Sequence, residues 1–462
     1  MFQTARSFGE VHFGEAELGN KARTRRLVKL ADELVRHPGG TLPHQIKDPA
    51  ALQAAYRLME REEVTHASVL AAHQAETHRQ IEAHDGPLLA ICDATELDYS
   101  GLKSLQQLGQ IGNGGRRGYI CQNVLIVDPQ DRRAVGLVNQ ILHTRAKAPK
   151  GESRKKLVHR QSRESRLWPE GTKELPADPK LVVVCDRGGD TFEELEHEAQ
   201  SGRHFVIRSR LNRKVFRDHT GRGAKKNLYK LARLAQSVGS YEVEVEAAHQ
   251  RPGRKAKVQF SFTAVRLIPP KQPCGIHSQK PLAVWIVRAW ESDPPKGATP
   301  LEWFLLTNTP VLQPAAARQV IDWYECRWVV EEYHKALKTG CNIENMQFTH
   351  QSRLEPMIAL LSVVALTLLN LRDASRQPDA QTTPATKVVD QEYVDVLSMW
   401  RHGEVRPDWT VHDFFQALAR LGGHQNRRRD KLPGWIVLWR GWTTLQILVS
   451  GSRLERKRKK LA

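Results

Sequence analysis

The sequence predicts an α/β core that carries an inserted antiparallel β region and is flanked by helical N- and C-terminal domains. Continuous apolar runs such as 88–92 and 181–185 are typical of buried strands in such a core. Alternating polar and apolar residues between about 215 and 310 favour antiparallel strands. Helical periodicity on both sides of this region divides the 462 residues into three predicted domains, 1–80, 81–376 and 389–462.

The charge balance favours a polyanionic partner. Lys and Arg total 70 against 51 Asp and Glu, a formal charge of +19 that is spread along the whole chain. Nucleic acid is the first partner that such a charge suggests, and an anionic membrane is the second. The longest apolar run, 357–371, is too short for a membrane span and predicts a buried helix. We therefore expect no membrane partner.

The cysteines and the first residues indicate a reducing compartment. The six cysteines are isolated, without a CxxC pair, which speaks against a zinc ribbon or a disulfide framework. Free thiols fit the cytoplasm, and residues 1–10 lack the apolar stretch of a signal peptide. No GxxxxGK[ST] loop, HExxH motif or ordered Ser/His/Asp set is present, so the sequence offers no visible site for those chemistries.

The N-terminal domain begins with a basic helix. Its predicted range is 18–36, with Asn20 as the N-cap, and a second helix follows from about Pro49. Arg23, Arg25 and Arg26 cluster on the first helix. They could bind phosphate or read a groove, although an ordinary solvated face explains them equally well.

The core strands end in acidic residues. The run 88–92 leads into Asp93, and the run 181–185 leads into Asp186. The remaining predicted core strands are 119–127, 134–142 and 204–208. A helix is expected from about Thr191, with Asp190 as its N-cap and Glu193 completing a capping box, so Asp190 is assigned to capping rather than to metal binding.

The second half of the chain alternates between strands and helices. Its predicted strands are 241–245, 258–265, 282–289 and 303–307. One helix is expected from Pro314 to Thr339, stopped by Gly340. A linker (377–387), C-terminal helices (392–400, 411–421 and 435–449) and a solvated basic tail (456–460) complete the prediction.

One polar stripe on the predicted helix 314–339 is the strongest local signal. Tyr324, Arg327, Glu331 and Lys338 fall within roughly 60° of one another at 100° per residue, and Lys335 joins them. The opposite face is apolar and suits packing on a core. A solvated polar face is the alternative interpretation.

Three carboxylates could converge on one spot. Ligands gather at the carboxyl ends of strands in α/β sheets, where Asp93 and Asp186 lie, and Glu331 would arrive from the helix. Mg²⁺ prefers such oxygen ligands and would offset their repulsion, and two ions about 4 Å apart suit phosphodiester cleavage. Asp93 could instead be a turn residue, with Glu96 or Asp98 as the ligand.

Several motifs are spread over nearly the whole chain. The most specific is Tyr324-x2-Arg327-x3-Glu331-x6-Lys338. The other blocks are Leu18-Gly19 with Arg23, Thr24, Arg26 and Leu27; Asp93-x-Thr95; Glu164-Ser165-x2-Trp168; Val184-Cys185-Asp186-Arg187 with Asp190; Phe205-Val-Ile-Arg208-Ser209; Arg318-x-Val320-Ile-Asp322; Ala417-x-Ala-Arg-Leu-Gly-Gly423; and Leu438-Trp439-x-Gly441-Trp442. Together these motifs resemble those of the insertion-sequence-four family of DDE transposases.

The resemblance implies an RNase H-like catalytic core in which Asp93, Asp186 and Glu331 bind two Mg²⁺ ions, for which Mn²⁺ can substitute. The DNA contacts that it implies are Tyr324, Arg327, Lys335, Lys338, Arg208, Trp303 (which would stack on a flipped base), Arg23 and Arg26. The implied activity is cut-and-paste transposition by a homodimer that binds the inverted repeats and the target as double-stranded DNA, in the cytoplasm and associated with the nucleoid.

Three alternatives stay open from the sequence. An RNase H-like DNA nuclease would use the same acids without strand transfer. A DNA-binding regulator could keep the fold after losing catalysis, although the presence of all three acids speaks against it. Trp303 could be a buried strand residue between Leu301 and Phe304 rather than a base-stacking residue.

Overall fold

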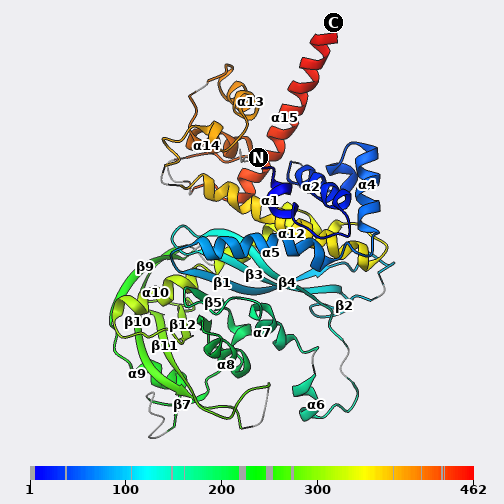
Figure 1. Cartoon of the computed structure of the whole chain (residues 1–462). Helices are drawn as coiled ribbons and strands as arrows, with labels where there is room; N and C mark the ends of the chain where they lie inside the picture. The colour runs from blue at the N-terminus through cyan, green and yellow to red at the C-terminus, as the bar shows by residue number, and fades with distance from the viewer. Residues whose placement is uncertain are drawn as a thin grey trace.

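The computed structural model describes residues 6–36, 39–105, 107–146, 149–160, 162–217, 225–245, 253–271, 275–377, 379–406, 408–427, 430 and 432–461. A 12-stranded sheet lies at the centre, and helices cover both of its faces (Figure 1). The predicted mixed α/β class is therefore confirmed. Residues 6–10 are described, whereas residues 1–5 and Cys274 lie outside the described ranges.

The middle of the sheet contains the predicted core strands. Its order is β4–β3–β1–β5–β6, in which β4, β3 and β1 pair antiparallel, whereas β1, β5 and β6 run parallel. The strands are β1 (Leu88–Asp98), β3 (Arg117–Asp128), β4 (Arg133–His143), β5 (Leu181–Cys185) and β6 (His204–Arg208), and the short β2 (Gly109–Gln110) extends the β3 edge. Near-complete burial of β5 explains its unbroken apolar run.

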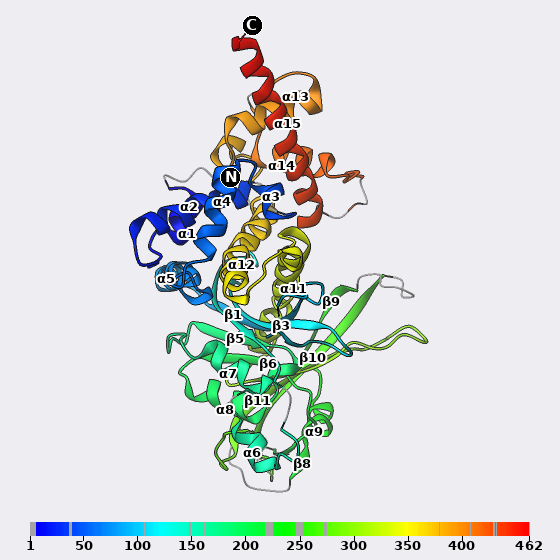
Figure 2. The ribbon, with the colours of Figure 1, turned by 90° about the vertical axis from the view of Figure 1, so that its right-hand side faces the viewer.

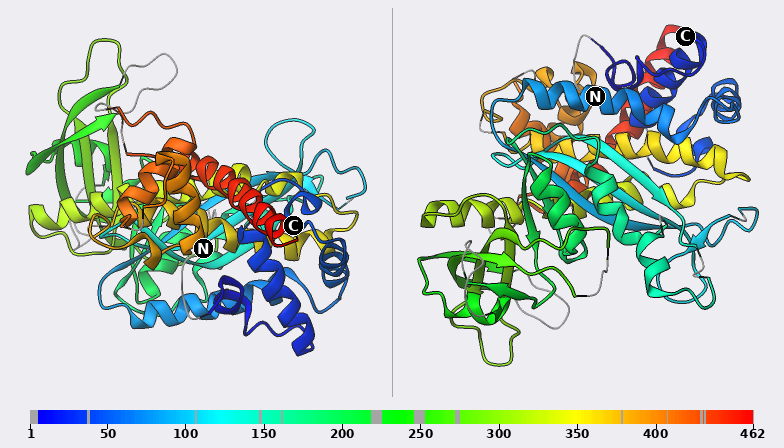
Figure 3. Two further views of the ribbon diagram at one scale, coloured as in Figure 1. Left: turned by 90° about the horizontal axis from the view of Figure 1, so that it is seen from above. Right: turned by 60° about the horizontal axis from the view of Figure 1, so that its bottom comes forward.

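The inserted β region continues the same sheet instead of forming a separate one (Figure 3). β12 pairs antiparallel with β6, so that Leu305 lies opposite Arg208. The strands beyond this junction are β12 (Glu302–Thr307), β11 (Leu282–Glu291), β10 (Arg254–Leu267), β9 (Gly239–Val245), β7 (Lys214–Phe216) and β8 (Lys226–Asn227). The sequence pattern predicted these strands but could not reveal this long-range pairing.

Two sets of helices cover opposite faces of the sheet (Figure 2). The first set packs with one buried cluster and contains α5 (His66–Ala83), α10 (Pro314–Glu325), α11 (Trp328–Lys335) and α12 (Gln351–Ala374). The second set packs on the other face and contains α7 (Leu167–Thr172), α8 (Phe192–Gln200) and α9 (Leu228–Leu234). α12 is apolar enough over Gln351–Asn370 to cross a membrane, but 83% of that stretch is buried in the protein, as in a core helix.

The N-terminal residues form a group of helices against α5 and α12. Their bounds are α1 (Phe8–Phe13), α2 (Lys21–Arg36), α3 (Leu42–Gln45) and α4 (Pro49–Met59). Asn20 caps α2 as predicted, because its Oδ1 accepts a hydrogen bond from the Arg23 N–H at 3.0 Å. A short basic helix, α6 (Arg154–His159), follows β4 and lies at the far end of the molecule (Figure 1).

The C-terminal helices are α13 (Gln391–His402), α14 (Val411–Leu421) and α15 (Trp435–Leu461). The predicted end of the last helix at residue 449 is wrong, because α15 continues through the basic tail and projects from the molecule, where residues 456–459 are exposed as predicted (Figure 1). Arg456 forms an ion pair with Glu392, and Arg458 lies 2.9 Å from Glu455 one turn earlier. Such pairs favour helix continuation. The predicted linker 377–387 contains a short 3₁₀ turn (Ala385–Lys387), and its residue 378 lies outside the described residues.

Two predicted boundaries in the core are also wrong. β1 does not end at Asp93, because residues 93–98 continue the antiparallel ladder with β3. The helix predicted over 314–339 is interrupted at Cys326 and Arg327 and ends in a π-helical turn, Ala336–Gly340. The N–H groups of Arg327, Val329 and Val330 bond three residues back, which tightens the backbone and turns α11 relative to α10.

A buried histidine pair joins the N-terminal helices to the core. The Leu137 N–H donates to His73 Nε2 at 3.0 Å, so the ring proton of His73 is on Nδ1 and is donated to His12 Nδ1, also 3.0 Å away. Burial lowers the pKa of His12 to about 4, although Glu76 opposes this shift, and burial also lowers the pKa of His73. Both rings are therefore neutral in the folded protein near neutral pH.

This pair predicts acid sensitivity. The unfolded chain takes up protons on these rings below about pH 6.5, and the folded chain does not, so stability is lost as pH falls from 6.5 towards 4. We expect His12→Gln, which keeps an acceptor but does not titrate, to lose less melting temperature between pH 7 and 5 than wild type. The exposed His44→Gln serves as the control, and an equal loss in all three proteins would contradict the prediction.

Candidate active site

The first two predicted acids lie on adjacent parallel strands. Cys92 of β1 is the backbone partner of Cys185 of β5, so Asp93 and Asp186 occupy the next position on neighbouring strands, which are about 4.8 Å apart. β5 ends there, and the Asp186 carboxylate accepts a hydrogen bond from the Gly188 N–H at 2.6 Å. This bond fixes the carboxylate at the carboxyl end of the strand.

The third acid reaches the same place from α11. Arg327 Nη1 lies 2.7 Å from Asp93 Oδ2, and Arg327 Nη2 lies 3.0 Å from Glu331 Oε1. One guanidinium therefore joins the two carboxylates, and their bonded oxygens are separated by no more than roughly 8 Å, the width of that group plus two hydrogen bonds. The predicted convergence of Asp93 and Glu331 is present.

The electrostatics place all three acids in one locality. Burial raises the pKa of Asp93 to about 7; Arg327 lowers it, while the charges of Asp186 and Glu331 raise it further. Because the charges of Asp186 and Glu331 both raise the pKa of Asp93, both carboxylates lie close enough to Asp93 for a Coulombic interaction. Added positive charge at this point would restore the ionised form of Asp93.

The donor set suits a hard divalent cation, but it is not gathered around one. No three His, Cys, Asp or Glu side chains in the described ranges stand together at metal-binding spacing. Arg327 lies between Asp93 and Glu331, where a cation is needed. Carboxylate oxygens are the ligands that Mg²⁺ prefers, so the side-chain chemistry suits the ion, while Arg327 occupies the place between two of the acids.

The acidic alternatives have other roles. Glu96 accepts a hydrogen bond from the Gly112 N–H at 2.6 Å, and Asp98 accepts one from the Ser100 N–H at 2.9 Å. Asp190 is fully buried, accepts the N–H groups of residues 210 and 211, and pairs with Arg213 at 2.6 Å. These contacts fold loops and leave Asp93 as the acid that faces Arg327.

The predicted cap of α8 is wrong. Thr191, not Asp190, is the N-cap, and its hydroxyl accepts the N–H of Glu194. The Asp190 carboxylate does not cap α8, because it accepts hydrogen bonds from backbone N–H groups of the loop 209–213 instead. The sequence could not reveal this loop crossing.

Trp303 lies beside two other predicted DNA contacts, Tyr324 and Arg208. Its ring lies 5.4 Å from that of Tyr324, edge to face, and the Arg208 guanidinium lies 5.9 Å from the centre of the Trp303 ring. Trp303 is half-buried, whereas Tyr324 is only 5% exposed. The placement of Tyr324 on a polar face is therefore a correction: in α10 it shares the buried face with Ala317, Val320 and Ile321.

The two predicted lysines differ in their contacts. Lys335 is exposed, and its Nζ lies 5.5 Å from the centre of the Trp328 ring. Lys338 donates to the Glu96 carbonyl oxygen and pairs with Glu344 at 3.3 Å. Trp328, which follows Arg327 and was not among the predicted site residues, is 54% exposed.

The remaining predicted contacts lie on the N-terminal helices. Arg23 Nη1 donates to the Leu18 carbonyl oxygen at 2.9 Å and lies 2.7 Å from Glu63, so its guanidinium is held within the domain. Arg26 lines a hollow of about 440 Å³ between α2 and α4, together with Lys29 and Arg36. The acids and these arginines belong to different parts of the fold.

Sequence reasoning missed a buried polar pair beside the acids. Asn123 is the backbone partner of Asp93, and its side chain contacts His334 of α11. The available signal was a polar residue inside the apolar run 119–127. Such a residue needs a buried partner, but the sequence does not name the partner.

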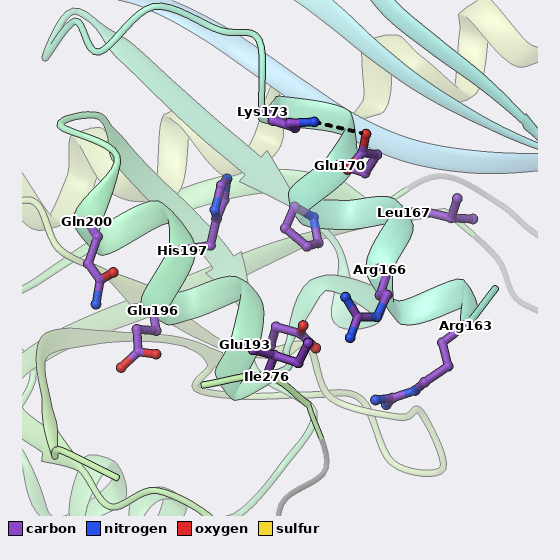
Figure 4. A pocket seen from close by; sticks show the side chains of 11 residues that line it. Arg163, Arg166, Leu167, Glu170, Lys173, Glu193, Glu196, His197, Gln200 and Ile276 are labelled. Atoms are coloured by element: carbon purple, nitrogen blue, oxygen red, sulfur yellow. Dashed lines mark ion pairs between the residues drawn. The ribbon is translucent and has the colours of Figure 1, made fainter. Parts of the chain in front are cut away.

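A separate cavity of about 550 Å³ lies between α7 and α8 on the opposite face of the sheet (Figure 4). It is lined by both charge signs; Lys173 and Glu170, for example, form an ion pair at 3.6 Å. None of the predicted site residues lines it. This cavity is therefore distinct from the three acids.

Two family models match the chain. The transposase DNA-binding model matches residues 5–64, which include Arg23 and Arg26. The transposase DDE domain model matches residues 91–368, more than half of the chain, and this range includes Asp93, Asp186 and Glu331. Together the matches indicate an enzyme that acts on DNA, with a separate DNA-binding part. The chain therefore belongs to the DDE transposase family.

Proposed function

We propose that this protein performs cut-and-paste transposition of an insertion sequence of the insertion-sequence-four family. Each element end is nicked, the freed 3′-hydroxyl attacks the opposite strand to give a hairpin, the hairpin is opened, and strand transfer into target DNA follows. Every step is an in-line displacement at phosphorus, so one set of acids serves all of them. The observation that carries the proposal is the contact of Arg327 with both Asp93 and Glu331 beside Asp186.

The strand order supports an RNase H-like core. Three antiparallel strands, β4, β3 and β1, are followed by β5 and β6 parallel to β1, with the acids at the centre. The inserted strands join this core at β6 and bring Trp303 beside Arg208. We propose that residues 1–80, 81–376 and 389–462 act as the end-binding, catalytic and dimerisation domains.

Asp93, Asp186 and Glu331 are the proposed ligands of two Mg²⁺ ions, for which Mn²⁺ can substitute. When bound, the ions supply an activated water or 3′-hydroxyl and stabilise the departing oxygen. Arg327 meanwhile exchanges its carboxylate partners for a DNA phosphate, which its planar fork can bind with two hydrogen bonds. The guanidinium thereby neutralises the acids until both DNA and metal are present.

The other proposed DNA contacts differ in how readily their side chains can reach DNA. Lys335 is exposed and directly available to phosphate, whereas Lys338 must first leave Glu344. Trp303, flanked by Arg208 and Tyr324, is the proposed stacking surface for a flipped base. Arg23 and Arg26 are the proposed contacts with the inverted repeat. Arg23 also stabilises the N-terminal end of α2 through its bond to the Leu18 carbonyl oxygen. The protein acts as a homodimer in the cytoplasm, associated with the nucleoid.

The first test is cleavage of a duplex that carries the inverted repeats flanking the gene, in the presence of Mg²⁺. Asp93→Ala, Asp186→Ala and Glu331→Ala should each lower the cleavage rate on the order of 10³-fold, because each removes an ion ligand. The exposed Glu174→Ala is the control. Retained cleavage in all three variants would end the proposal.

The rivals give different products in the same assay. A nuclease would cut the duplex but would not join labelled ends to a plasmid. An inactive regulator would bind the duplex with steep salt dependence and leave it uncut. Joined products that require all three acids would exclude both rivals.

Arg327→Met should make stability depend on divalent metal. Without the guanidinium, Asp93 and Glu331 both lose their ion-pair partner, and we expect a melting temperature lower by a few °C. Addition of Mn²⁺ should raise the melting temperature of this variant more than that of wild type. Arg79→Met, which loses only surface pairs, is the control. An equal Mn²⁺ effect in all three proteins would contradict the exchange of guanidinium for metal.

Trp303→Ala should separate two steps of the reaction. The first nick needs no flipped base, so its rate should stay near that of wild type, whereas hairpin formation should fall by roughly 10-fold or more, since stacking contributes about 1–3 kcal/mol per base. The half-buried Trp290→Ala on the adjacent strand is the matched control. The measurement is the ratio of hairpin to nicked product on denaturing gels, and equal loss of both products would oppose this role.

A further inference from the structure

A buried hydrogen bond joins the strand of Asp93 to the helix of Glu331. Asp93 and Asn123 are directly opposite each other in the β1–β3 ladder, so their side chains project to the same face of the sheet. Asn123 is fully buried, and its Nδ2 lies 3.2 Å from Nε2 of His334. His334 follows Glu331 by three residues, and thus lies about one turn away on α11.

The surrounding contacts fix the direction of this bond. Asn123 Nδ2 also donates to the Cys121 carbonyl oxygen at 3.2 Å, and its Oδ1 accepts from Gln140 Nε2 at 2.8 Å. The amide orientation is therefore set, and Nε2 of His334 must be an acceptor. Burial, together with Lys338 and Arg327, lowers the pKa of His334 to about 3, which keeps the ring neutral.

The neighbouring residue secures the same face of α11. The Tyr333 hydroxyl donates to the Ser362 carbonyl oxygen of α12 at 3.1 Å, and Gln140 Nε2 bonds the Ser362 hydroxyl at 2.9 Å. These side-chain bonds matter because α11 begins after a tight turn and ends in a π-helical turn. Neither end continues into regular helix, so contacts along the helix determine its rotation.

We propose that Asn123 and His334 are positioning residues that hold the helix of Glu331 in register with the strand of Asp93; this inference rests on the proposed function. A helix displaced by one residue turns its side chains by about 100°, which would carry Glu331 away from Asp93. Apolar packing is non-directional and restrains small rotations of a helix only weakly. A buried hydrogen bond between fixed atoms is directional and opposes them.

The test uses the full-length protein bound to the flanking inverted-repeat duplex, with Mn²⁺ binding followed by electron paramagnetic resonance. His334→Leu removes the acceptor, whereas His334→Gln places an amide oxygen where Nε2 lies. We expect His334→Leu to need about 10–100-fold more Mn²⁺ for half-saturation, as when partners of metal ligands are lost elsewhere. His334→Gln should stay near wild type. Circular dichroism and DNA mobility shifts confirm that both variants fold and bind DNA.

Two further variants separate the possible failures. If Glu331→Gln binds Mn²⁺ as tightly as wild type, the proposed function fails and the inference fails with it. If Glu331→Gln loses Mn²⁺ but His334→Leu keeps it, only the positioning role is overturned. Asn123→Leu combined with His334→Leu removes both ends of this bond, and Gln140 Nε2 keeps its bond to the Ser362 hydroxyl, so the double variant should recover part of the thermal stability but not the Mn²⁺ affinity. Recovery of both would assign the defect to an orphaned polar group and overturn the inference.

Discussion

Three carboxylates that approach one another must be held against their own repulsion, and the surrounding structure depends on how this is done. Burial and the two neighbouring charges raise the pKa of Asp93 to about 7, even with Arg327 only 2.7 Å away. The side chains stay in place because each belongs to an element with its own bonding. Asp93 lies inside the β1–β3 ladder, Asp186 is fixed by Gly188, and Glu331 is carried by a helix anchored through its opposite face.

The continuous sheet brings distant segments to that point. Because β12 pairs with β6, Trp303 lies beside Arg208 and under Tyr324, although the three residues are spread over more than a hundred positions. The inserted strands are thus an extension of the core rather than an appendage. A continuous sheet between the acids and Trp303 would keep the proposed stacking and phosphate sites at a constant separation.

The parts of this arrangement that could be predicted from the sequence are those whose structure one local pattern determines. β5 coincides with its apolar run and β6 with the predicted range 204–208, and of the three acids that the sequence singled out, Asp93 and Glu331 are joined by Arg327. Long-range contacts explain two of the errors, and bonding within a tight turn explains the third. Pairing with β3 extends β1 past Asp93, bonds to residues three back interrupt the helix before Trp328, and ion pairs with Glu392 keep the basic tail helical. Tyr324 was misplaced because helical spacing does not extend through a tight turn.

Arg327 makes the proposed DNA and metal contacts interdependent. Its guanidinium cannot pair with Asp93 and Glu331 and at the same time leave that position to a divalent ion. A phosphate that draws Arg327 away makes metal binding more favourable. By linkage, the metal strengthens phosphate binding by the same factor. The helix must keep its place while its arginine changes partners. The buried bond from Asn123 to His334 supplies that fixed reference, because it lies on the inner face of α11 and involves none of the groups that exchange.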